Sequence, residues 1–180
     1  MQSKILAGGL LLWAMLLSGM VQAASREEIN ATVDETLEKF YEESPAGRRL
    51  AQEAVAMLVF PRVIKAGVGI GGEYGEGALV AGGQPIAYYN TVSASIGFQL
   101  GAQVKSQIIM FMTQEALDRF RSTEGWEAGV DGSVAIVEFG VGEEINTNSI
   151  QDPIIGFVFS NRGLMYNLTF EGAKMTEIDR

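Results

Sequence analysis

The sequence predicts an α+β fold: a strongly bent antiparallel sheet, open or partly closed into a barrel, with the N-terminal helices packed on one face. Three observations lead to this prediction. Strand-like runs follow one another through short turns, which favours antiparallel pairing. Helical periodicity is confined to residues 25–58 and one short later segment. Glycine recurs through residues 67–77, where it indicates a sharp bend or the close approach of another element.

Residues 1–23 have the composition of a secretory signal. Lys4 supplies a short positive region, an apolar run follows, and Val21-Gln22-Ala23 places small residues at a cleavage site. We expect cleavage after Ala23 and export, with the periplasm as the location that fits best; the alternative is an uncleaved N-terminal anchor. Loss of Lys4 makes the net charge of −9 one unit more negative. Such an acidic chain argues against a nucleic-acid partner.

The chain contains neither cysteine nor histidine. Disulfides, Ser-His-Asp and Cys-His nucleophilic sites and the usual zinc sites are therefore excluded. The carboxylates of Glu73, Glu76 and Asp131 invite an acid/base proposal, but no nucleophile and base accompany them. We expect a protein that is not an enzyme, with no catalytic residue, metal site or cofactor.

The first helix of the exported chain is expected from Ser25 to about Glu43. Ser25-Arg26-Glu27-Glu28 has the S-x-x-E pattern of a capping box. Apolar residues then recur every three or four positions, at Ile29, Val33, Leu37 and Phe40. The opposite face is acidic, whereas helices that lie on membranes are usually rich in lysine and arginine. We therefore expect this helix to pack on the domain or on a partner rather than on lipid.

A second helix is expected to begin at Ser44-Pro45, because serine is a good N-cap and proline suits the first helical position. Its inner face carries Leu50, Ala54, Met57 and Leu58, and Pro61 is expected to end it. After the glycine-rich strand, Gly82-Gly83 is a hairpin signal between two strands. The expected later elements are a buried strand at 107–112, a helix at 114–122 and strands at 126–130, 133–139, 154–160 and 164–170.

The glycine-rich stretch permits two interpretations. Gly67, Gly69 and Gly72 spell the G-x-G-x-x-G pattern of dinucleotide sites, which requires a helix to open within the motif. The following residues are broken by further glycines and show no helical period, so we reject a nucleotide site. A bent strand with another element against its bare face fits the pattern better.

Motifs along the chain resemble the SYLF domain family. Phe60-Pro61, Lys65, the alternating glycines and Tyr74-Gly75-x-Gly77 resemble its opening signature. The resemblance spans residues 45–175 and continues in matching order through these segments: Tyr88-Tyr89, residues 95–103, Phe111-Met112-Thr113, residues 125–131 and Gly163-Leu164. SYLF is a lipid-binding family whose eukaryotic members bind phosphoinositides and in some cases actin. The implied organisation is a signal at 1–23, a helix at 24–44 and a SYLF-like domain at 45–180.

The resemblance implies an exported lipid-binding protein that contacts anionic phospholipid or phosphoinositide-like headgroups in a bacterial envelope. Lys65 occupies the family's lysine position, where an ammonium group would contact phosphate. Arg48, Arg49 and Arg62 would join it if the second helix docks nearby; otherwise all four are separate solvated charges. The alternative function is a structural or assembly protein that binds an envelope protein through its acidic helix.

Overall fold

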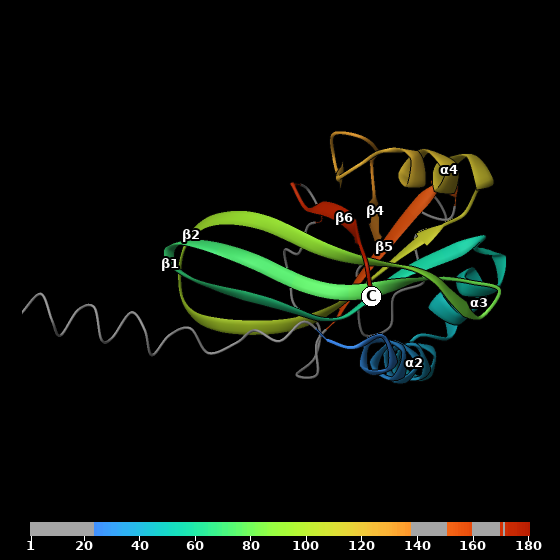
Figure 1. Cartoon of the computed structure of the whole chain (residues 1–180), viewed down its shortest axis with the longest axis horizontal. Helices are drawn as coiled ribbons and strands as arrows, with labels where there is room; N and C mark the ends of the chain where they lie inside the picture. The colour runs from blue at the N-terminus through green and yellow to red at the C-terminus, as the bar shows by residue number, and fades with distance from the viewer. Residues whose placement is uncertain (1–23, 138–150, 160–169, 171) are drawn as a thin grey trace, which may run out of the picture.

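Two very long strands form the centre of the fold, which Figure 1 shows as a computed structural model. Strand β1 covers Ala56–Ala81 and strand β2 covers Gln84–Phe111. They pair antiparallel across the Gly82-Gly83 turn, where both glycines have positive φ (58° and 76°), as a two-residue hairpin turn requires. The structure describes residues 24–137, 151–159, 170 and 172–180, with the backbone alone at 67–70 and 95–103.

Strand β2 is the middle of a mixed sheet. It pairs with β1 along one edge, and along the other with β6 near its start and β5 near its end. The described strands are β3 (Trp126–Glu127), β4 (Ala135–Val137), β5 (Ile154–Phe159) and β6 (Lys174–Ile178). Their pairing is antiparallel, as predicted, except between β4 and β5, which run parallel. The α+β prediction with a strongly bent sheet is therefore confirmed.

Strand β1 curls until its two halves touch. The backbone of residues 59–63 lies directly against Gly75 and Gly77, and a Cβ atom at Gly77 would overlap the Val59 carbonyl oxygen. A Cβ atom at Gly75 would sit 2.8 Å from the Arg62 carbonyl oxygen. At Gly75 and Gly77, the element that approaches the bare backbone is thus the first part of the same strand.

Helices cover the two faces of the curled sheet. Helix α2 (Arg26–Glu43) and helix α3 (Pro45–Glu53) lie on one face, and α4 (Gln114–Ser122) lies on the other (Figure 1). Phe40 of α2 meets Phe157 of β5 edge to face, with ring centroids 4.9 Å apart. On the other face, Phe120 of α4 packs on Trp126 at 5.5 Å. Each helix therefore closes its own apolar layer.

The caps and faces of α2 follow the sequence closely. The Ser25 side chain accepts a hydrogen bond from the Glu28 backbone N–H, and Ser44 does the same for Gly47 at the start of α3. The four predicted apolar positions of α2 are buried against the sheet, whereas its acidic side chains are exposed. The prediction that this helix packs on the domain is confirmed. No helix within the described residues is both long and apolar enough to cross a membrane.

Two element predictions need correction, and one strand was missed. The second helix ends at Glu53 rather than at Pro61, because residues 56–60 are drawn into β1, where Leu58 and Val59 are fully buried on opposite faces. Pro61 sits at a register shift of β1, where its missing N–H costs no ladder bond. The strand expected at 126–130 stops at Glu127, because Gly129 adopts a positive φ of 88°. Strand β6 was not predicted.

Several sequence predictions fall outside the described residues. These are the signal segment at 1–23, the end of the strand expected at 133–139, and residues 164–169 of the last expected strand.

Candidate functional site

A cluster of three charged side chains lies on the face of the β1–β2 hairpin that α4 also covers. Glu73 Oε2 is 2.5 Å from Lys105 Nζ, and Glu73 Oε1 is 3.5 Å from Lys65 Nζ. The pairing of β1 with β2 explains why these three side chains lie together. Val63, two residues before Lys65, pairs with Lys105, and Glu73 lies on the second half of β1, which curls back toward the first half. Lys65 follows Val63 on the same face of β1, so the cluster lies beside the apolar layer to which Val63 belongs.

The cluster carries two positive charges and one negative charge. The Lys105 side chain is 3% exposed and Glu73 is 12% exposed, so these two form the buried part of the cluster. A buried charge is tolerated only when it is paired, and Glu73 supplies that partner for Lys105. Lys65 is 26% exposed and lies farther from the carboxylate. The arrangement therefore presents one excess positive charge at its open side, chemically suited to an anion.

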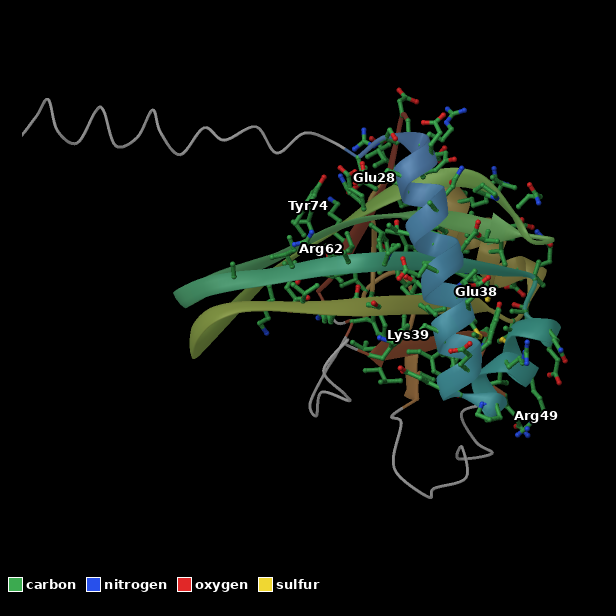
Figure 2. The ribbon with its side chains drawn as sticks, turned by 90° about the horizontal axis from the view of Figure 1, so that it is seen from below. Glu28, Glu38, Lys39, Arg49, Arg62 and Tyr74 are labelled. Carbon is green, nitrogen blue, oxygen red and sulfur yellow. The ribbon has the colours of Figure 1, made fainter. Side chains whose placement is uncertain are left out.

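Arg62 lies on the opposite face of β1 from Lys65. It lines a groove of about 410 Å³ between α2 and β1, together with Ile64, Tyr74 and Glu76. Figure 2 shows Arg62 and Tyr74 near the end of α2 that carries Glu28. Strand alternation is the reason: residues 62 and 64 point to the groove, while 63 and 65 point to the charged cluster.

Arg48 and Arg49 lie apart from the other two predicted cations. They stand in the middle of α3, and Arg49 is at the far end of α2 from Arg62 (Figure 2). The Arg48 guanidinium carbon is 5.8 Å from the centre of the Tyr41 ring, which favours a cation–π contact. The structure thus does not gather the four cations into one patch. Their roles in binding lipid remain predictions.

Exposed apolar residues occupy two cross-strand pairs on the groove face. Ile64 pairs with Val104, and Tyr74 pairs with Val92. Each of the four side chains is between 38% and 46% exposed; Ile86, near the turn of the hairpin, is exposed as well. The middle of the hairpin, toward which these pairs lie, projects away from the helices (Figure 1). One end of the molecule thus carries apolar surface on one face of the hairpin and the lysine cluster on the other.

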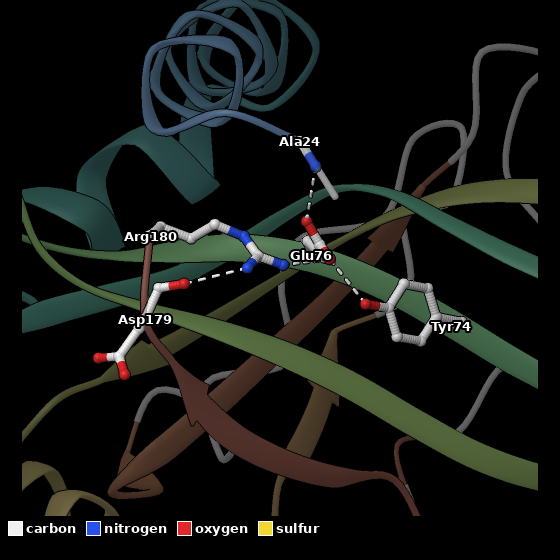
Figure 3. A network of polar contacts seen from close by, with 5 residues as sticks. All are labelled: Ala24, Tyr74, Glu76, Asp179 and Arg180. Carbon is white, nitrogen blue, oxygen red and sulfur yellow. Dashed lines mark hydrogen bonds and ion pairs between the residues drawn. The ribbon is translucent and has the colours of Figure 1, made fainter. Parts of the chain in front are cut away.

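Glu76 is the centre of a second polar network, drawn in Figure 3. Its Oε1 accepts hydrogen bonds from Tyr74 Oη at 2.7 Å and Arg180 Nη2 at 2.5 Å, and its Oε2 accepts from the Ala24 backbone N–H at 3.3 Å. Partial burial and the hydrogen bond to Glu76 raise the pKa of Tyr74 to about 12, against the opposing effect of Arg180. Glu76 is therefore engaged in holding chain segments together.

Five aromatic residues belong to the core of the fold. Tyr88, Tyr89, Trp126, Phe157 and Phe159 are all at most 9% exposed. Burial and a hydrogen bond to Glu177 raise the pKa of Tyr89.

A comparison with models of known protein families identifies the family to which the chain belongs. Residues 92–180 match the family model described as Ysc84, Las17-binding protein actin regulator. The chain is a SYLF-domain protein. This family is linked to the binding of lipids or of actin regulators, and the matched half runs from β2 through β6 and so includes Lys105. No curated protein matches the chain.

Sequence reasoning gave Lys105 little weight, although it completes the charged cluster. In the sequence, Lys105 looks like an ordinary polar residue before a buried strand. Only the pairing register of β1 with β2 places it beside Glu73. Arg180 was also missed, because nothing in the sequence places it beside the first helix.

Proposed function

We propose that this SYLF-domain protein is an exported, non-enzymatic lipid-binding protein that contacts anionic phospholipid headgroups in the bacterial envelope. The observation that carries the proposal is the excess positive charge at Lys65, Glu73 and Lys105, with exposed apolar side chains on the opposite face of the same end of the hairpin. In this arrangement Lys65 contacts phosphate, and Lys105 holds Glu73 in place behind it.

The overall charge of the protein opposes this binding, so the local arrangement must overcome it. An anionic membrane repels a chain of net charge −9, but salt screens that repulsion beyond about 10 Å at 0.1 M ionic strength. Within that distance the lysine cluster dominates. A single basic residue near an anionic surface contributes only about 1 kcal/mol. Electrostatics through Lys65 alone would therefore give weak binding.

Apolar contact supplies the larger part of the expected affinity. Complete burial of a large apolar side chain contributes about 1.5–3 kcal/mol relative to exposure. Ile64, Val104, Tyr74 and Val92 are already more than half buried, so each adds a fraction of that value when it meets acyl chains. Together the four contributions exceed that of one ammonium group. The proposal thus assigns selectivity to Lys65 and affinity to the two cross-strand pairs.

Vesicle flotation tests the proposal. The chain beginning at Ala24 is mixed with vesicles of phosphatidylethanolamine alone or with added phosphatidylglycerol, at low and at physiological salt. We expect flotation only with phosphatidylglycerol and less of it at higher salt. Absence of flotation under all four conditions would contradict the proposal.

A second candidate function is supported by the exposed acidic face of α2. Glu35 and Glu38 are exposed, with further exposed acidic side chains along the same helix. A basic envelope protein would find complementary charge there. Charge reversal at Glu35 and Glu38 would then abolish cross-linking to such a partner and leave vesicle flotation unchanged.

A further inference from the structure

Ala24, the residue that follows the predicted cleavage site, is held in a defined position. Its backbone N–H donates to Glu76 Oε2 at 3.3 Å, and its methyl group packs against the apolar layer between α2 and the sheet. Ser25 caps α2 immediately afterwards. The start of the exported chain is therefore fixed by a hydrogen bond, an apolar contact and a helix cap.

The carboxylate of Glu76 divides its two oxygens between partners. Oε1 accepts from Tyr74 and Arg180, whereas Oε2 accepts from Ala24 (Figure 3). The side chain is only 11% exposed, and the Arg26 side chain donates to the Arg180 carbonyl oxygen, which keeps Arg180 in place. Glu76 thus faces the Ala24 nitrogen with an oxygen that carries no other hydrogen bond among the described residues.

We propose that Glu76 is the binding site for the α-ammonium group that signal removal creates at Ala24. Before cleavage the Ala24 nitrogen is a neutral amide with one proton. Afterwards it is an ammonium group with three protons and a positive charge, in the same place. The Glu76 carboxylate is already a charged acceptor for the amide, and the ammonium group adds a positive charge on the donor side, so the contact gains a direct Coulombic attraction. Removal of the signal therefore strengthens the attachment of α2 to β1.

The proposal rests on the export step of the proposed function and is independent of lipid binding. Its consequence is that the folded state of the processed chain is more stable than that of the same domain in the precursor. The positive charges of Arg180 and Arg26 lie in the same network and weaken the effect, while Glu28, which lines the same groove, favours the ammonium group. Glu76 is the one carboxylate in direct contact with the nitrogen among the described residues.

A thermodynamic cycle tests the pairing. The chain beginning at Ala24 is prepared with a free α-amine and with the amine acetylated by an N-terminal acetyltransferase, each with and without Glu76→Gln. Urea unfolding of the four proteins gives their stabilities. We expect acetylation to lower the folding equilibrium constant about fivefold when Glu76 is present, and less than twofold in the Glu76→Gln background. Equal effects in both backgrounds would overturn the proposal.

A second measurement needs no substitution. The ammonium form does not react with acylating reagents, so a paired α-amine is protected. We expect the α-amine of the folded chain to be acylated at least fivefold more slowly than in the urea-unfolded chain at the same pH. Equal rates would overturn the proposal.

The mass of the exported protein separates failure of this inference from failure of the proposed function. A mature N-terminus at Ala24 with no coupling to Glu76 overturns the pairing alone. A mature N-terminus at another residue also overturns it, but leaves binding to vesicles as an independent result. A precursor that keeps residues 1–23 overturns both the pairing and the cleaved-export part of the proposed function.

Discussion

The contact between the two halves of β1 makes Gly77 a sensitive position. A Cβ atom there would overlap the Val59 carbonyl oxygen and lie 2.8 Å from both the Val59 carbonyl carbon and Phe60 Cδ1. Ordinary contacts of a Cβ atom begin at 3.4 Å, so even the two carbon atoms must retreat by 0.6 Å. Two of the three obstructing atoms belong to the backbone. They cannot rotate away, and Gly77→Ala must open the curl of the strand.

Gly72→Ala provides the matched control. At Gly72 the nearest atom to an added Cβ is the Ser93 carbonyl oxygen at 3.5 Å, an ordinary contact. Both substitutions reduce the entropy of the unfolded chain equally, by about 0.4–1 kcal/mol, so this gain cancels in the comparison. The difference is the steric cost, which is about 1–3 kcal/mol for an overpacked site. Because the Gly77 contact is with backbone, we expect the upper end, about 3 kcal/mol.

Urea unfolding followed by circular dichroism measures this difference. We expect Gly77→Ala to unfold at a clearly lower urea concentration than the unsubstituted chain, and Gly72→Ala to unfold at the same or a slightly higher one. Equal midpoints for the two variants would refute the conclusion that the curl depends on a bare backbone at Gly77.

Three further outcomes follow from named contacts. Ser44→Ala removes the buried acceptor of the Gly47 N–H (2.9 Å), and we expect a loss of about 1–2 kcal/mol in urea unfolding; a loss under 0.3 kcal/mol would contradict the cap. Tyr74 has a pKa of about 12 in the folded chain and 10 when unfolded, so its neutral form stabilises the fold fully below pH 10 and this contribution is lost as the pH rises toward 12. Absorbance titration should show one fewer phenol ionising near pH 12 in Tyr74→Phe, and an unchanged curve would contradict the assignment. Glu73→Gln leaves its two lysines without their carboxylate, so we expect lower stability and about fivefold stronger binding to anionic vesicles; unchanged binding would contradict the cluster's role.

Local signals in the sequence predicted most of the helices and the hairpin turn. Ser25, Ser44 and Thr113 each cap the helix expected after them, and Gly82-Gly83 forms the expected turn. These features depend on neighbouring residues alone, so sequence patterns reveal them. The SYLF resemblance is likewise confirmed by the matching family model.

Long-range register could not be predicted, and it decides the site. Pairing counted back from the turn, starting with Ala81 opposite Gln84, would put Phe60 opposite Lys105. Two register shifts between the turn and Lys105 move it opposite Val63 instead, near Glu73. No local rule gives the size of those shifts. Strand alternation also puts Arg62 and Lys65 on opposite faces of β1, although the sequence had suggested that they lie close together.

Tertiary burial also changed one element. Residues 56–60 have an apolar content that suits either a helix or a strand buried on both faces. The sheet takes them, because β2 offers backbone partners from Phe111 to Gln107 and both of its faces are covered by helices. Strand β6 was missed because it has only five residues, with one buried position, Met175.

Vesicle flotation of two charge-reversed variants is the most direct test of headgroup contact. Lys65→Glu and Arg49→Glu change the net charge equally, but Lys65 is at the charged cluster and Arg49 is on α3, at the far end of α2 from Arg62. With vesicles containing phosphatidylglycerol, we expect Lys65→Glu to abolish flotation and Arg49→Glu to leave most of it, with both variants folded by circular dichroism. Equal flotation of the two variants would contradict the role of Lys65 and show that binding follows net charge alone.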